Sequence, residues 1–115
     1  MRIVFMGTPD FAVPSLRALA GSHDVSLVVT RPDAVRGRGR RLEPSPVKAC
    51  AMTLGIEVCE ARRMDDAAIE RIRAQRPDVI CVAAYGVILP DSVLAIAPHG
   101  CINVHASLLP RGRGA

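Results

Sequence analysis

Asn103 and His105 are the residues whose types and spacing best fit chemistry, and they stand two apart at the end of an apolar run. Side chains two residues apart on a strand share a face, and open α/β sheets bind ligands at the carboxyl ends of their strands. An amide can donate to the oxyanion of a tetrahedral intermediate and an imidazole can move a proton, as acyl or formyl transfer requires. Taken alone, an Asn-x-His pair is common and more often structural than catalytic, so both interpretations stay open at this level.

Two other kinds of site find no support in the sequence. Ser107 lies outside any G-x-S-x-G pattern and has no evident base, so we expect it to shape a pocket and not to act as a covalent nucleophile. A dinucleotide-binding domain would carry G-x-G-x-x-G after its first strand, whereas residues 7–9 read GTP, and the GRG at residues 37–39 has no third glycine in register. Nicotinamide binding is therefore not expected.

Positive charge is concentrated in one segment. The chain has 15 Lys and Arg against 11 Asp and Glu, for a formal net charge of +4. The clustered arginines are Arg36, Arg38, Arg40 and Arg41. Guanidinium groups suit phosphates and neighbouring glycines permit close backbone approach, which favours an exposed, mobile loop that contacts phosphates. The alternative is a solvated connection, the usual role of a charge run.

The composition is that of one globular domain with an aliphatic core. The 115 residues are 50% hydrophobic and 23% charged, with no Trp, one Tyr and two Phe. Because the four cysteines (Cys50, Cys59, Cys81 and Cys101) lack the close pairing of zinc and redox motifs, we expect reduced core thiols and no metal. No apolar stretch is long enough for a signal region or a membrane span, so we expect a cytoplasmic protein.

Apolar runs alternate with helical patterns along the chain. We expect strands over residues 2–6, 25–30, 56–59, 78–84 and 100–104. We expect helices over residues 11–20, 46–54, 65–75 and 91–95, with Ser45 and Gly55 bounding the second of them, and a loop over residues 31–46. The nearly continuous apolar run at 78–84 indicates the centre of a parallel sheet. The pattern predicts a doubly wound, mainly parallel, Rossmann-like α/β fold.

The sequence also resembles a known family, the methionyl-tRNA formyltransferases. The resemblance covers the whole chain and rests on residues 6–14 (MGTPDFAVP), 31–33 (RPD), 37–39 (GRG), 44–48 (PSPVK), 84–90 (AYGVILP) and 102–111 (INVHASLLPR). The N-x-H and SLLP elements are shared with other enzymes that use 10-formyltetrahydrofolate, such as glycinamide ribonucleotide formyltransferase. The opening motif and the arginine-rich loop ending in PSPVK point to the tRNA enzymes.

The resemblance implies that a formyl group moves from 10-formyltetrahydrofolate to the α-amino group of methionine on initiator tRNA, without a metal or a membrane. Asn103 and His105 match the catalytic residues of the family. The folate-binding segment is matched by Ser107, Leu108, Leu109 and Pro110, and the loop that approaches the tRNA acceptor arm by Arg36, Arg38, Arg40 and Arg41. The resemblance also implies a cytoplasmic, monomeric parent enzyme.

Two departures from the family pattern affect these expectations. The family has a catalytic Asp that partners the His and a C-terminal β-barrel domain that helps to hold tRNA, and both would follow residue 115. We therefore expect residues 1–115 to be part of the N-terminal formyltransferase domain and to be inactive alone. Gly112 also stands where the family usually has an aromatic residue. The alternatives are another 10-formyltetrahydrofolate-dependent formyltransferase, or a non-catalytic RNA-binding module that uses the arginine loop.

Overall fold

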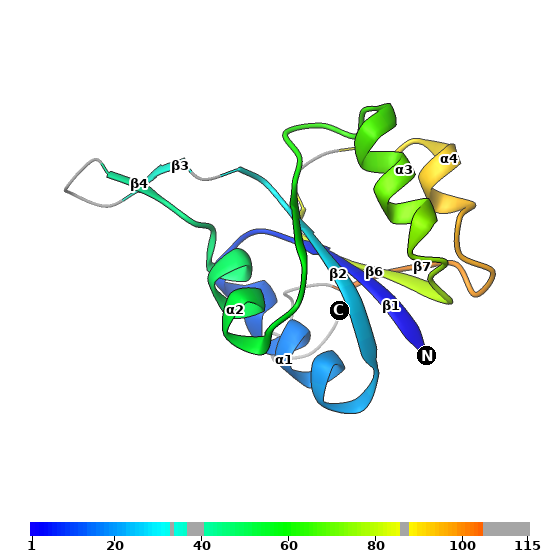
Figure 1. Cartoon of the computed structure of the whole chain (residues 1–115), viewed down its shortest axis with the longest axis horizontal. Coiled ribbons are helices and arrows are strands. Elements are labelled where there is room, and N and C mark those ends of the chain that lie inside the picture. The colour runs from blue at the N-terminus through cyan, green and yellow to red at the C-terminus, as the bar shows by residue number, and fades with distance from the viewer. Residues whose placement is uncertain (33, 37–40, 86–87, 105–115) are drawn as a thin grey trace, which may run out of the picture.

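In the computed structural model, five parallel strands form one sheet with helices on both of its faces (Figure 1). The structure describes residues 1–32, 34–36, 41–85 and 88–104. The strands of the sheet are β1 (Arg2–Gly7), β2 (Asp24–Thr30), β5 (Val58–Glu60), β6 (Val79–Ala83) and β7 (Cys101–Asn103). The helices are α1 (Val13–Ser22), α2 (Pro46–Leu54), α3 (Asp66–Ala74) and α4 (Asp91–Leu94), and a short 3-10 helix, η1 (Asp10–Ala12), precedes α1.

The order of the strands is β5-β2-β1-β6-β7, and each neighbouring pair is parallel. The centre of the sheet is β1, whereas the sequence places residues 78–84 there. β6 lies directly beside β1, and its successive residues pack into the apolar layers on both faces of the sheet, which accounts for its apolar sequence. Parallel strands joined by helices confirm the predicted doubly wound α/β fold.

Two apolar layers cover the faces of the sheet. The layer under α1 and α2 includes Ile3, Phe5, Leu16 and Val47. The layer under α3 and α4 includes Val4, Met6, Ile72 and Val93. Successive residues of β1 thus alternate between the two layers, as the pleat of a strand requires. The core is mainly aliphatic, as predicted.

Local signals define the ends of the helices. The side chain of Ser45 accepts a hydrogen bond from the backbone N–H of Lys48 at 3.0 Å, with Pro46 in the first turn of α2. Gly55 ends α2 with φ of 73°, in the left-handed region that favours glycine. Asp65 caps α3 by accepting from the N–H of Ala68 at 2.9 Å. Each of these helices begins and ends within a residue of its prediction.

Three sequence predictions need correction. The loop predicted over residues 31–46 contains β3 (Ala34–Arg36) and β4 (Arg41–Glu43), which pair in an antiparallel hairpin. Arginine and glycine are not typical strand formers, so the composition conceals this pairing. β5 starts at Val58 instead of residue 56. The helix predicted over residues 11–20 is α1 at Val13–Ser22: it starts later because residues 10–12 form η1, and it ends later because the N–H of His23 still bonds to the carbonyl of Leu19.

The cysteines behave as predicted. Cys50, Cys59 and Cys81 are buried, Cys101 is half-buried, and all four are free thiols.

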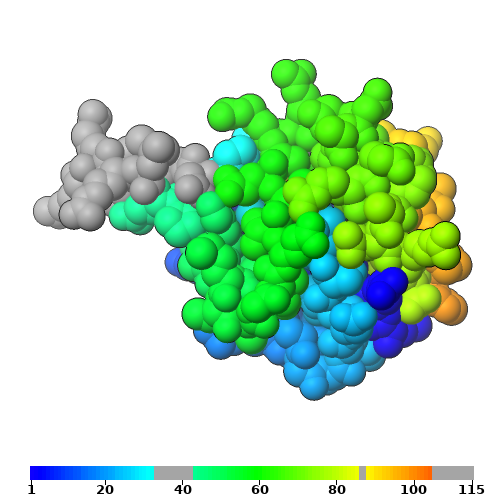
Figure 2. Space-filling model, viewed as in Figure 1, coloured from blue at the N-terminus to red at the C-terminus, as the bar shows by residue number. Residues whose placement is uncertain are grey.

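Within the described part of the chain, no helix is both long and apolar enough to span a membrane. In the space-filling view, α2 and the chain that follows it form the surface that leads towards α3 (Figure 2).

Candidate active site

The carboxyl ends of the inner strands meet at one edge of the sheet. Gly7, the last residue of β1, pairs with Ala83 at the end of β6, and Val82 pairs with Asn103 at the end of β7. The connections that leave these strands therefore start side by side. Open α/β sheets bind their ligands at this edge.

A cavity of about 490 Å³ lies beside Asn103 at this edge. Its walls are Val82, Leu89, Leu94, Cys101 and Asn103. Cys101 packs against the apolar layer under α3 and α4, and Asn103, two residues further along β7, shares that face. Apolar walls with one amide suit a flat organic ligand whose orientation is fixed by a few polar contacts.

The structure places Asn103 where the sequence predicts it, at the carboxyl end of the last described strand. Its side chain is exposed, and no residue in the described ranges makes a hydrogen bond with its amide. The amide can therefore donate to a ligand in the cavity. An amide that donates from a fixed strand end can stabilise a developing oxyanion.

Most of the other predicted site residues lie outside the described part of the chain. These are His105, Ser107, Leu108, Leu109, Pro110, Arg38 and Arg40. The convergence of His105 with Asn103 and the mobility of the arginine segment thus stay predictions. The backbones of Arg36 and Arg41 lie opposite each other in the antiparallel pair of β3 and β4.

Gly7 allows β1 and β6 to end close together. A Cβ atom at this position would lie 2.8 Å from the backbone oxygen of Ala83 and 3.2 Å from the Cβ of Ala12. The first of these distances is shorter than real Cβ contacts, so only glycine fits without a shift of the backbone. The turn after β1 is thereby held against the segment that follows β6.

Burial favours the neutral form of two titratable groups near this edge. The hydroxyl of Tyr85 donates to the backbone oxygen of Ala61 at 2.6 Å, and burial raises the pKa of Tyr85 to about 12. Burial also raises the pKa of the Cys101 thiol above its usual value. Tyr85 therefore acts as a structural donor. Cys101 contributes an uncharged wall to the cavity and lacks the thiolate character of a nucleophile.

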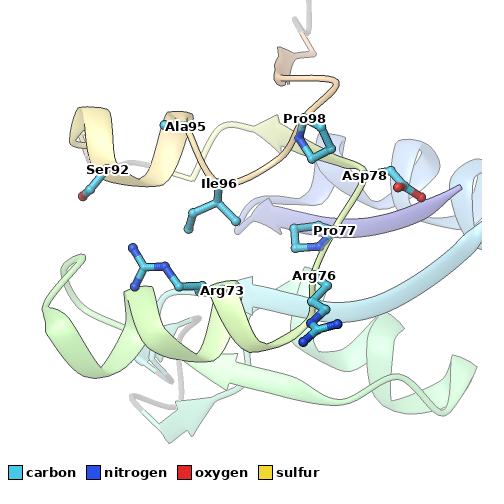
Figure 3. Close-up of a pocket in the computed structure, with 8 residues that line it drawn as sticks. All are labelled: Arg73, Arg76, Pro77, Asp78, Ser92, Ala95, Ile96 and Pro98. Carbon is cyan, nitrogen blue, oxygen red and sulfur yellow. The ribbon is translucent and has the colours of Figure 1, made fainter.

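A larger cavity of about 650 Å³ lies at the opposite end of the sheet, between α3 and α4 (Figure 3). Ile96, Pro77 and Pro98 form its apolar part. Two of its polar groups have structural partners: Arg73 bonds to Glu70 at 3.0 Å, and Asp78 accepts from the backbone N–H of Arg2 at 2.8 Å. This cavity faces the amino ends of β6 and β7 and is separate from the ligand-binding edge.

No metal centre is formed by the residues that can be described: among them, no three His, Cys, Asp or Glu side chains are grouped so as to hold an ion. The sequence reasoning missed the cavity walls Val82, Leu89 and Leu94. Apolar side chains have no chemical signature in a sequence, and only the fold brings these three together. The single signal that could have identified Leu89 is its place within the AYGVILP motif.

Residues 1–115 match the family model described as formyl transferase. The chain belongs to the formyl transferase family. This match covers every element described above, including the strand that ends at Asn103.

Individual relatives agree with this family. The chain is 59% identical over 116 residues to methionyl-tRNA formyltransferase of Xylella fastidiosa (strain 9a5c) and of Stenotrophomonas maltophilia (strain R551-3). It is 54% identical over 117 residues to that of Methylobacillus flagellatus. Each comparison covers 100% of this chain and 38% of the relative. The chain thus spans well under half of the length of these relatives.

Solved structures support the fold. Phosphoribosylglycinamide formyltransferase from Streptococcus pneumoniae TIGR4 superposes with a TM-score of 0.65 at 20% identity, over 99% of this chain and 61% of that chain. Glycinamide ribonucleotide transformylase 1 from Symbiobacterium toebii gives a TM-score of 0.62 at 20% identity, over 99% and 55%. At this identity the likeness concerns the arrangement of the strands and helices alone.

Proposed function

We propose that this chain is part of an enzyme that transfers a formyl group from 10-formyltetrahydrofolate to the α-amino group of methionine on initiator tRNA. The observation that carries the proposal is the place of Asn103, at the carboxyl edge of the sheet and on the wall of a cavity. The choice of acceptor is supported by relatives called methionyl-tRNA formyltransferase at 54% and 59% identity.

The proposed chemistry uses Asn103 and His105 in different roles. The neutral amine attacks the formyl carbon, so that a new C–N bond forms and the carbonyl oxygen becomes an oxyanion. Asn103 donates its amide N–H to this oxyanion. His105 accepts the proton that the amine loses and donates it to N10 of the folate as the oxyanion collapses and the old C–N bond breaks. The formyl group then resides on the methionine nitrogen.

We assign the folate to the cavity beside Asn103. Val82, Leu89 and Leu94 provide apolar walls for a flat ring system, and the Asn103 amide marks the end of the cavity where the formyl group must lie. In this proposal the segment formed by Ser107, Leu108, Leu109 and Pro110 completes the folate site. The thiol of Cys101 is a neutral wall of the same cavity.

We assign the arginine segment to the phosphates of the tRNA. Arg36 pairs with Arg41 across the β3–β4 hairpin, and the connection between them includes Arg38 and Arg40. Arginine forks suit phosphates, and four arginines within six residues of one hairpin support this assignment.

Residues 1–115 correspond in this proposal to part of the N-terminal formyltransferase domain of a cytoplasmic, monomeric enzyme. A C-terminal β-barrel domain would add to tRNA binding, and a carboxylate from outside this sequence would orient His105. The chain spans 38% of the length of its relatives, which leaves room for both. We accordingly expect residues 1–115 alone to be inactive.

The test uses an enzyme in which this sequence is joined to the remaining part of one of its relatives. It compares two acceptors of the formyl group. Formyl transfer from 10-formyltetrahydrofolate is measured with methionyl-tRNA and with glycinamide ribonucleotide. We expect formylation of the tRNA and negligible formylation of the ribonucleotide. The reverse preference would support the alternative formyltransferase. Tight binding of tRNA without transfer to either acceptor would support the non-catalytic RNA-binding module.

A further inference from the structure

The segment between β2 and α2, here called the basic arm (residues 31–44), is flanked by two residues that are hydrogen-bonded to each other. Figure 1 shows its strands β3 and β4 outside the five-stranded sheet, beyond α2. Thr30 precedes the basic arm and Ser45 follows it, and their hydroxyl oxygens lie 2.7 Å apart in a buried hydrogen bond. Ser45 also caps α2. The two ends of the basic arm are therefore joined to each other and anchored to a strand and a helix.

Thr8, in the turn after β1, contacts the start of the basic arm and the helix that follows the arm. Its hydroxyl oxygen accepts a hydrogen bond from the backbone N–H of Arg31 at 3.4 Å, at the first residue of the basic arm. Its backbone oxygen accepts from the N–H of Val47 at 3.5 Å, in the first turn of α2. Only the contact with Arg31 involves the Thr8 side chain, so a substitution of Thr8 can remove that contact and leave the contact with Val47 in place.

The same Thr8 hydroxyl also contacts the segment that follows β6. It donates to the backbone oxygen of Tyr85 at 3.3 Å. Tyr85 is itself fixed, because its side chain is buried and its hydroxyl bonds to Ala61. The chain that leaves Tyr85 leads to Leu89, a wall of the cavity beside Asn103. A single hydroxyl group thus bonds both to the first residue of the basic arm and to Tyr85, four residues before Leu89 in the sequence.

We propose that Thr8 is a positioning residue that sets the basic arm relative to the folate cavity. This inference rests on the proposed function, in which the basic arm holds tRNA and the cavity holds folate. Transfer requires the amine on one substrate to meet the formyl carbon on the other, and small errors in placement reduce such rates strongly. Because the Thr8 hydroxyl bonds to both segments, its loss affects both substrates. The Thr30 hydroxyl joins only the two ends of the basic arm.

The experiment compares three substitutions in an enzyme in which this sequence is joined to the remaining part of one of its relatives. Thr8→Val removes the hydroxyl and keeps the shape of the side chain, Thr8→Ser keeps the hydroxyl, and Thr30→Val removes a hydroxyl from the base of the basic arm alone. Thr53→Val is the matched control, because Thr53 is exposed on α2 and bonds only to carbonyls within that helix. For each variant, kcat and the KM of both substrates are measured, and hydrogen exchange of the Arg31 amide is followed by NMR.

We expect Thr8→Val to lower kcat/KM for both substrates about tenfold, because a small misplacement of two reactants reduces the rate of transfer strongly. The Arg31 amide should exchange faster in this variant whether or not the enzyme is active. Thr8→Ser should restore the wild-type values, and Thr30→Val should raise only the KM of tRNA. Thr53→Val should match the wild type.

The positioning role is overturned if Thr8→Val keeps wild-type kinetics with both substrates, or if Thr8→Ser is impaired as severely as Thr8→Val. It is also overturned if Thr8→Val raises only the KM of tRNA, because the link to the cavity would then be absent. A wild-type enzyme that does not formylate methionyl-tRNA would instead overturn the proposed function, which separates the two failures.

Discussion

The hydroxyl of Tyr85 donates a 2.6 Å hydrogen bond to the backbone oxygen of Ala61, which joins the segment after β6 to the segment after β5. Tyr85 is only 1% exposed and is the largest fully buried side chain in the described structure. The bond therefore lies in the apolar layer under α3 and α4. A buried donor and acceptor that satisfy each other make this contact more important for stability than a surface hydrogen bond.

Tyr85→Phe should reduce the free energy of unfolding. The substitution keeps the ring and leaves the oxygen of Ala61 without its donor, a loss that typically costs about 1–3 kcal/mol. Urea denaturation of the wild type and the variant measures the difference. Equal denaturation midpoints and slopes would mean that water replaces the hydroxyl at this site.

Tyr85 should also make stability depend on alkaline pH. Its pKa is about 12 in the folded protein because of burial, and the ordinary value, about 10, applies to the unfolded chain. Unfolding thus favours the tyrosinate, so the contribution of Tyr85 is complete below about pH 10 and is lost as the pH rises towards 12. Tyr85→Phe should lack this loss. Since the chain has one Tyr, the ultraviolet absorbance of tyrosinate gives the titration directly.

Two glycine substitutions should have opposite effects on stability. Gly7→Ala introduces a Cβ 2.8 Å from the backbone oxygen of Ala83, so β1 and β6 must shift apart and the protein should be destabilised. Gly21→Ala meets no atom within 4 Å and lies in the last turn of α1, where alanine is favoured by about 0.5–1 kcal/mol. Thermal unfolding of both variants tests this contrast. A stable Gly7→Ala protein would show that the strand ends separate easily.

The fold is predictable from sequence wherever several local signals agree. α2 is predicted to the residue because Ser45, Pro46 and Gly55 mark its start and end independently. β5 is predicted two residues early because Ile56 is apolar and packs against the core, whereas the strand pairing begins at Val58. Apolar character reports burial, and hydrogen bonding between strands is a separate property.

The sequence predicts the part of the site that depends on local features and does not predict contacts between segments that are distant in the chain. Asn103 can be placed at the end of a strand, because the strand pattern and the position of polar residues are local features. The contacts of Thr8 with Arg31 and Tyr85 depend on where separate strands end in space. Such contacts become visible only when the register of the sheet is known.

Arg38→Ala should weaken tRNA binding and make it less dependent on salt, while folate binding stays nearly unchanged. Each phosphate contact contributes about 0.9 to the slope of log K against log salt concentration, so the slope should fall by about one. Arg17→Ala on the exposed face of α1 is the matched control with the same change of charge. An Arg38→Ala enzyme with the wild-type affinity and slope would identify the basic arm as a passive connection.

Asn103→Ala and His105→Ala should lower kcat far more than they weaken tRNA binding, because both interactions belong to the transition state in the proposed reaction. The loss of one oxyanion donor typically reduces kcat about 100-fold or more. Leu94→Ala serves as the comparison: it enlarges the apolar cavity and should raise the KM for 10-formyltetrahydrofolate with a smaller effect on kcat. Steady-state kinetics with each substrate varied in turn distinguish the two patterns. If Asn103→Ala retained the wild-type kcat and raised only the folate KM, Asn103 would be a binding residue of the cavity and the oxyanion would need another donor.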